Sequence, residues 1–218
     1  MIYIRKGTEP RSLTEYRNQP GATYEGYREK DALRDALLEE QGYICAYCMR
    51  RISKEKMKIE HWKAQNAPDG TGAKHALEYQ NMLGVCLGNQ SSPHDMQTCD
   101  TYRGNAELFV DPRKEAHTQQ IAYRGDGTIY SEDSRIDFDL NQRLNLNCEG
   151  ALLKQGRKEA IRTLQVYLEQ KHVHGQWSIE LLNKVKRRFE SRQDGKYQPY
   201  IGAILFWIEH YKKRAQNN

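Results

Sequence analysis

The sequence of 218 residues contains no long hydrophobic run. Its longest apolar stretch, Tyr200 to Ile208, is less than half as long as a helix that spans a bilayer, so we expect no membrane contact. The opening residues, MIYIRKGTEPRS, have no apolar core of an export signal, which predicts a cytoplasmic location. With 38% hydrophobic and 29% charged residues, the composition excludes a disordered or membrane-embedded chain.

Cysteine is scarce, but its placement is uneven. Cys148 stands apart and is expected to be an ordinary thiol. The other four fall within 55 residues: Cys45, Cys48, Cys86 and Cys99. Cytoplasmic thiols stay reduced, so a metal is favoured over disulfides. Four thiolates complete the tetrahedral shell of a structural zinc ion. His94, five residues before Cys99, is an alternative fourth ligand.

The formal net charge of +5 is mild, but the basic residues are concentrated towards the C-terminus. The stretch KVKRRF, residues 184 to 189, and the stretch YKKR, residues 211 to 214, mix basic with aromatic residues. Such a stretch is either a solvated helix face or a surface that contacts phosphates. The second interpretation assigns nucleic-acid contacts to Lys184, Lys186, Arg187 and Arg188.

The pattern of elements predicts an α+β fold with most of its residues in helices. Residues 1 to 39 contain one short strand (Ile2 to Arg5), a loop, and a helix from Tyr24 that stops at Gly42. Residues 40 to 112 are rich in loops and need more than apolar packing to hold them. Residues 113 to 218 contain a hairpin around Asp126-Gly127 and then three helices.

The last of these helices follows Pro199 and is apolar nearly all round. It is therefore buried either by this chain or by another protein.

Polar residues with catalytic potential lie inside the frame of cysteines. His61 suits the role of a general base, because its pKa lies near neutrality. Glu60 and Asp100 offer the hard oxygen ligands that favour Mg²⁺ or Mn²⁺. The amide of Asn81 can bridge backbone groups and hold the histidine loop in place.

The combined spacing resembles the zinc-pinned form of the HNH endonuclease superfamily. That family has a CxxC, an acidic residue followed by His, an Asn five residues before a third Cys, and a fourth Cys leading into a polar metal ligand. Asp100 follows Cys99, and Arg103 takes the place of a basic residue often seen there. The resemblance implies a ββα-metal nuclease core over residues 40 to 112, a basic contact to nucleic acid at Arg103, and a catalytic set consisting of Glu60, His61, Asn81 and Asp100.

Further segments are similar to PtuB-type HNH effectors of Septu and retron anti-phage systems. These segments are LLEEQGYICAYC, EHW, YQNMLGVC, CDTYRG and LNLN (residues 144 to 147). The resemblance implies a nuclease that cuts DNA or RNA, an ABC-type ATPase partner of the PtuA kind, and, in retron-attached systems, a reverse transcriptase with its nucleic acid. Two alternatives stay open: a zinc-stabilised module that binds nucleic acid without cutting it, and an adaptor that works through its apolar C-terminal helix.

Overall fold

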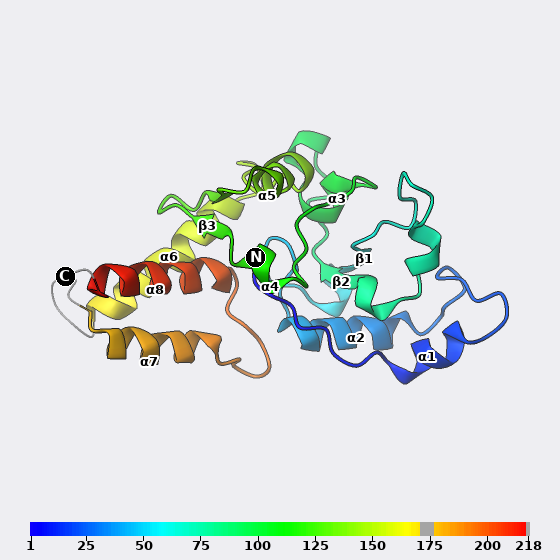
Figure 1. Ribbon diagram of the computed structural model, residues 1–218, viewed down its shortest axis with the longest axis horizontal. Coiled ribbons are helices and arrows are strands. Elements are labelled where there is room, and N and C mark those ends of the chain that lie inside the picture. The colour runs from blue at the N-terminus through cyan, green and yellow to red at the C-terminus, as the bar shows by residue number, and fades with distance from the viewer. Residues whose placement is uncertain (171–176, 217–218) are drawn as a thin grey trace.

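The computed structural model describes residues 1–170 and 177–216, and Figure 1 shows an elongated molecule with a lobe on either side of the N-terminus. The first lobe contains α1 (Arg11–Arg17), α2 (Lys30–Gln41), β1 (Lys58–His61), β2 (Met82–Val85) and α3 (Cys99–Arg103). The helical lobe contains α6 (Leu153–Glu169), α7 (Ile179–Glu190) and α8 (Ile201–Gln216). Between them lie α4 (Glu115–Thr118), β3 (Ile121–Tyr123), β4 (Ile129–Ser131) and α5 (Ser134–Phe138), which a π-turn over Asp139–Arg143 extends. The predicted α+β class is confirmed.

The N-terminal region differs from its prediction in three places. The expected helix begins at Lys30 and not at Tyr24. Residues 24 to 26 form one isolated turn, in which Tyr27 N donates to Thr23 O and to Tyr24 O, and residues 27 to 29 separate this turn from the helix. It ends as expected at Gly42, which adopts a left-handed φ of 61°. Ile2 to Arg5 forms no strand, although Ile4 N donates to Pro112 O. A short helix, α1, replaces part of the expected loop.

The strands β1 and β2 pair in antiparallel fashion, with Lys58 opposite Val85 and His61 opposite Met82. The buried amide of Gln41 at the end of α2 fastens that helix to β2, since its Nε2 donates to Gly84 O and its Oε1 accepts from Gly84 N, both at 2.7 Å. The end of β1, which carries His61, is therefore held from the α2 side as well as by its partner strand.

The predicted hairpin around Asp126-Gly127 is confirmed as β3 and β4, with Ile121 opposite Ser131. Gly127 has a φ of 87°, and a Cβ at this position would lie 2.0 Å from the Lys154 carbonyl oxygen. Glycine is required here both by the turn and by the close approach of α6.

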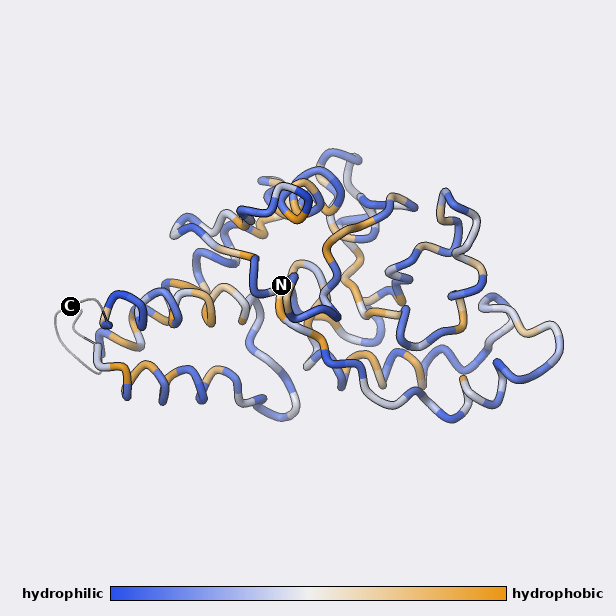
Figure 2. The backbone as a smooth tube through the Cα atoms, in the orientation of Figure 1, coloured by the Kyte–Doolittle hydropathy of each residue, from blue (hydrophilic) through white to orange (hydrophobic). Residues whose placement is uncertain are grey.

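In the helical lobe, α8 packs against both α6 and α7. Ser178 caps α7 by accepting a hydrogen bond from Leu181 N at 3.2 Å. The buried side of α8 contains Ile201, Ala203, Ile204, Ile208 and Tyr211. Figure 2 shows hydrophobic residues along α6, α7 and α8. The chain itself thus covers much of the apolar helix.

Several contacts join residues 40 to 112 to the rest of the chain. Tyr200 N donates to Met49 O at 3.0 Å, and Arg50 Nη2 donates to Ala151 O at 2.6 Å. Residues 171–176 and 217–218 of the predicted third region lie outside the described residues. Within the described part of the chain, every helix is too short or too polar to cross a membrane.

Candidate active site and metal centre

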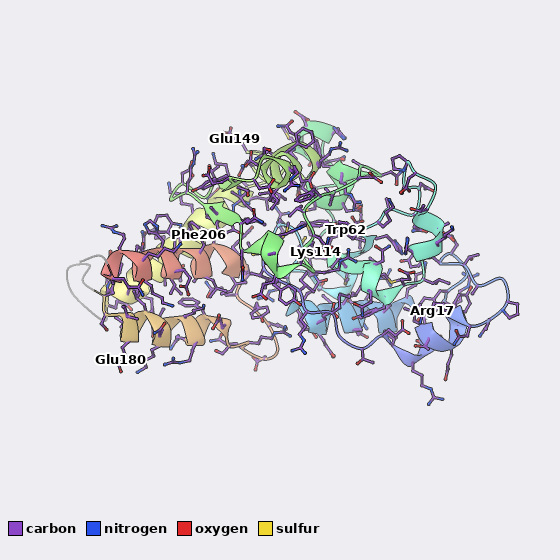
Figure 3. All side chains as sticks on the ribbon, in the orientation of Figure 1. Arg17, Trp62, Lys114, Glu149, Glu180 and Phe206 are labelled. Atoms are coloured by element: carbon purple, nitrogen blue, oxygen red, sulfur yellow. The ribbon has the colours of Figure 1, made fainter. Side chains whose placement is uncertain are left out.

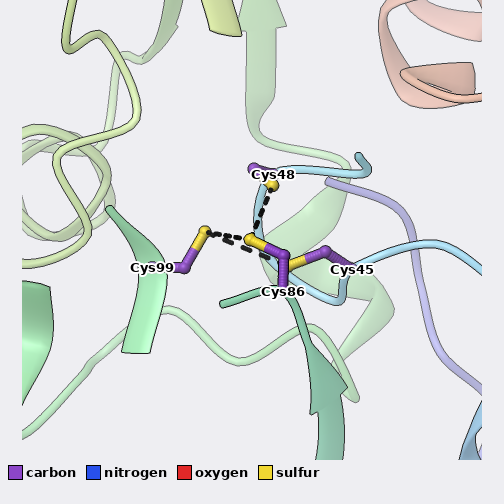
Figure 4. A group of neighbouring side chains, drawn as sticks. All are labelled: Cys45, Cys48, Cys86 and Cys99. Carbon is purple, nitrogen blue, oxygen red and sulfur yellow. Dashed lines mark hydrogen bonds between the residues drawn. The ribbon is translucent and has the colours of Figure 1, made fainter. Parts of the chain in front are cut away.

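The four clustered cysteines come from three separate places in the chain, and Figure 4 shows them converging on one another. Cys45 and Cys48 lie in a tight turn after α2, in which Cys45 N donates to Arg50 O and Met49 N donates to Cys45 O. Cys86 directly follows β2, and Cys99 is the first residue of α3. All four are buried, and their sulfur atoms lie within 4.8 Å of one another.

The spacing of the sulfurs fits a tetrahedral metal. The Sγ atoms of Cys48 and Cys86 are 3.7 Å apart, those of Cys86 and Cys99 are 3.8 Å apart, and those of Cys45 and Cys99 are 3.9 Å apart. Zn–S bonds of about 2.3 Å in tetrahedral geometry give sulfur–sulfur edges of about 3.8 Å. Hydrogen bonding among the thiols, with Cys45 first, raises the pKa of both Cys48 and Cys99 well above the usual range. Four buried cysteines at this spacing could hold a metal ion such as zinc.

The alternative ligand, His94, lies outside this group. Its ring is exposed and stacks on Tyr102 with centroids 4.6 Å apart. The segment that carries it is held separately, since Asn145 Nδ2 donates to Asp95 O and to Gln97 O.

The LNLN segment fastens the cysteine loops to the C-terminal half. Leu144 O accepts from Cys99 N at 2.8 Å. Asn147 bonds both the N and the O of Ile129 in the hairpin, and its Oδ1 accepts from Arg157, a fully buried residue of α6. The resemblance of this segment to PtuB-type proteins implied no role for it. The structure shows that its asparagines form hydrogen bonds with backbone groups of neighbouring loops.

His61 lies at the end of β1 and is buried, with 5% of its surface exposed. Its Nε2 lies 2.9 Å from Ala76 O. A carbonyl oxygen only accepts, so Nε2 carries the hydrogen and Nδ1 keeps its lone pair. Nδ1 lies 3.3 Å from the Gln65 amide nitrogen, a long contact that water can replace. Burial lowers the pKa of His61 below 6.5, while the bond to Ala76 O acts in the opposite direction.

Asn81 clamps the loop that follows His61. Its Oδ1 accepts from Lys63 N at 2.8 Å, and its Nδ2 donates to Lys63 O and to His75 O. In addition, Asn81 O accepts from Trp62 N at 2.8 Å. Most of these bonds join the Asn81 side chain to backbone groups of the loop, as the predicted orienting role requires. None of them involves the four cysteines.

Glu60 is buried beside Asp100. Its Oε1 accepts hydrogen bonds from the Tyr47 hydroxyl, at 3.0 Å, and from Arg103. Burial raises the pKa of Glu60 well above its usual range, and the neighbouring Asp100 raises it further, while Arg103 lowers it. Asp100 on α3 is partly exposed and lies 3.7 Å from Lys58 Nζ on β1. The two carboxyl groups thus face each other between β1 and α3.

Arg103, to which the resemblance assigns a contact with nucleic acid, is buried. The structure buries its guanidinium, which bonds Glu60 and donates to Trp62 O at 2.6 Å and to Ala106 O at 2.7 Å. The reason is that α3 ends with Arg103 turned towards the end of β1, where a buried carboxylate and two carbonyls need donors.

The four basic residues predicted on the C-terminal stretch lie on α7, in the opposite lobe from β1 (Figure 1). Figure 3 labels Glu180 at the start of α7, far from Trp62 beside His61. Lys184, Arg187 and Arg188 are exposed, whereas Lys186 pairs with Glu209 at 2.8 Å.

No motif in the sequence singles out Tyr24 or Gln65, which the fold brings against His61. The ring of Tyr24 meets the imidazole edge-on, with centroids 4.5 Å apart. Tyr24 precedes the CxxC by some twenty residues, and only the tertiary structure reveals the contact.

Comparison with known proteins agrees with these features. No family model matches the chain. It is 29% identical over 122 residues to a protein of Escherichia coli named as an HNH endonuclease of retron Ec83, over 49% of this chain and 47% of that protein. The resemblance to the HNH endonuclease superfamily is confirmed. A Vibrio cholerae serotype O1 biovar El Tor protein, named in the same way for retron Vc95, is 28% identical over 102 residues, 46% of this chain and 47% of that protein. The chain thus spans about half the length of the curated HNH relatives it matches.

Proposed function

We propose that this chain is a metal-dependent HNH endonuclease that hydrolyses phosphodiester bonds in DNA or RNA. The observation that carries the proposal is the arrangement at the end of β1, where His61 directly follows Glu60 and the buried Glu60 carboxyl faces Asp100, in a segment that also brings four buried cysteines together. The similarity to proteins named as retron HNH endonucleases supports it.

In this proposal β1, β2 and α3 form the ββα-metal core, and each polar residue has one task. Nδ1 of His61 takes a proton from the attacking water, because Nε2 is committed to Ala76 O. Glu60 and Asp100 would hold Mg²⁺ or Mn²⁺, which would supply positive charge near the leaving oxygen when bound. Asn81 keeps the loop after His61 in position. A zinc ion held by the four cysteines would have no open position, so it would be structural.

A cleavage assay tests the proposal. Purified chain is incubated with plasmid, single-stranded DNA or total cellular RNA, with Mg²⁺ or Mn²⁺ and with EDTA. We expect cleavage of at least one substrate that requires the divalent ion and disappears in His61→Ala. The matched control is His210→Ala, which changes an exposed histidine on α8 in the helical lobe.

One observation favours the alternative of a zinc-stabilised module that binds nucleic acid without cutting it. Glu60 Oε1 is already engaged by Tyr47 and Arg103, and both ring nitrogens of His61 have protein partners. Binding that is the same in the parent and in His61→Ala, with no cleavage of any substrate, identifies this alternative.

We further propose that the chain is the effector nuclease of a retron or Septu anti-phage system, in complex with an ABC-type ATPase of the PtuA kind. The retron names of its relatives support the setting. Exposed apolar side chains away from the cysteine group, such as Tyr3, Val166 and Ile179, offer contacts for a partner. Co-expression with an ATPase encoded nearby, followed by size-exclusion chromatography, tests this. A chain that elutes alone contradicts it, as does a complex unaffected by Tyr3→Asp, Val166→Asp and Ile179→Asp together.

A further inference from the structure

Tyr24 contacts the candidate general base although it lies in the segment before α2, outside every element of the HNH pattern. Its ring stands at 89° to the imidazole of His61, with centroids 4.5 Å apart, an edge-to-face arrangement that aromatic rings prefer. Tyr24 is partly buried, and burial raises the pKa of its hydroxyl to about 12. The contact therefore belongs to the interior of the molecule.

The fold holds Tyr24 itself in place. The ammonium of Lys30, the first residue of α2, lies 3.7 Å from the centre of the Tyr24 ring. In the turn that precedes the helix, Tyr27 N donates to Thr23 O at 3.2 Å and to Tyr24 O at 3.3 Å. Since Gln41 ties α2 to β2, the ring and the imidazole rest on one connected framework.

A cavity of about 1060 Å³ adjoins this contact. Tyr24 lines it from the N-terminal segment, and Gln65 and Ala76, the two partners of His61, line it from the loop between β1 and β2. Without the Tyr24 ring, the imidazole would gain access to this space. The bond to Ala76 O fixes only one nitrogen, so the imidazole could then turn about that bond and solvate Nδ1.

We propose that Tyr24 is a positioning residue for His61, whose ring fixes the imidazole plane so that the Nδ1 lone pair points at the water to be activated. The proposal rests on the proposed nuclease function of His61. A displacement of about 1 Å in a catalytic group can cost roughly 100-fold in rate, so loss of one of three restraints is expected to reduce kcat markedly. Nucleic-acid binding should not change, because the ring faces the imidazole and Lys30.

The kinetic test compares Tyr24→Ala with Tyr24→Phe, which keeps the ring. The matched control is Tyr16→Ala: Tyr16 supports the same segment, through Thr23 N and the Tyr27 ring, and packs on these residues and not on His61. We expect Tyr24→Ala to lower kcat about tenfold or more with KM unchanged, Tyr24→Phe to restore most of that loss, and Tyr16→Ala to change kcat less than threefold. A loss in Tyr24→Ala no larger than in Tyr16→Ala overturns the proposal. So does a rise in kcat, a change confined to KM, or a Phe variant as slow as Ala.

A second readout does not depend on cleavage. Diethyl pyrocarbonate modifies accessible neutral imidazoles, and peptide mapping gives the rate at His61 relative to the exposed His94 of the same molecule. We expect a several-fold faster reaction at His61 in Tyr24→Ala only, with zinc content equal in all variants. Equal rates in Tyr24→Ala and the parent overturn the proposal. If no variant cleaves nucleic acid but His61 becomes accessible in Tyr24→Ala, the nuclease function fails while the enclosure of His61 by Tyr24 stands.

Discussion

Arg103 on α3 donates a hydrogen bond through Nη1 to Oε1 of Glu60 on β1, and both side chains are buried. The same guanidinium donates to Trp62 O, so it holds residues on both sides of His61. A buried ion pair is costly to break because the remaining charge has no partner. Arg103 and Glu60 therefore fasten the end of β1 to α3 at the point where the candidate base lies.

Arg103→Met should lower the free energy of unfolding by about 3–5 kcal/mol, because it leaves Glu60 buried without its cation. Urea unfolding of the zinc-loaded chain measures this. The double variant Arg103→Met, Glu60→Gln should recover part of the loss, since it leaves no isolated charge. Unchanged stability together with weakened nucleic-acid binding would instead support the nucleic-acid contact that the resemblance implies for Arg103.

The four cysteines should bind one zinc ion per chain. Metal analysis of the purified protein should find it, and Cys86→Ser combined with Cys99→Ser should lose both the zinc and the fold, because structural zinc contributes on the order of 10 kcal/mol to folding. Cys148→Ser is the control and should keep both, since Cys148 lies outside the group. Zinc retained by the double variant would show that other ligands hold it.

His61→Ala should reduce the cleavage rate by about two to four orders of magnitude, the usual contribution of general-base catalysis. Zinc content and the circular dichroism spectrum should match those of the parent, because His61 is not among the metal-binding sulfurs. Cleavage at the parental rate would contradict the role assigned to its Nδ1.

The pH dependence of cleavage should reflect the burial of His61. Burial lowers the pKa of His61, so the neutral form that accepts a proton persists below pH 6.5. As pH falls, the rate should therefore stay level through 6.5 and decline only below it. The profile of kcat/KM against pH for the parent gives the midpoint of that decline. A midpoint above 6.5 would mean that His61 is not the base or that substrate binding reverses the effect of burial.

The exposed arginines of α7 distinguish a phosphate-contacting surface from a solvated helix face. If Arg187 and Arg188 contact phosphates, replacing both with Ala should reduce the slope of log K against log salt by about 0.9 per lost contact. The control replaces Lys158 and Arg162, two exposed basic residues of α6, in the same way. Equal slopes in both double variants would identify the α7 stretch as a solvated face.

The placement of Cys45 near Cys48, and of Glu60 next to His61, was predictable from the sequence because residues so close in the chain stay close in space. Two cysteines three residues apart share one turn, and Glu60 and His61 are adjacent on a strand. The hairpin at Asp126-Gly127 was likewise predictable, because its turn requires the left-handed backbone that Gly127 adopts. The start of α2 was not, because residues 24 to 26 form a turn with a helical bond that does not continue into the helix.

The sequence by itself determined which residues could bind zinc, which histidine could act as a base, and that the last helix had to be buried. Tertiary structure alone decided that His94 stacks on Tyr102 and does not join the cysteines, that Arg103 turns inward to Glu60, and that Tyr24 lies against His61. The physical reason is the range of the interactions. Spacing along the chain sets contacts within a turn or a strand, whereas Arg103 and Glu60 are 43 residues apart, and the packing of α3 against β1 decides whether they meet.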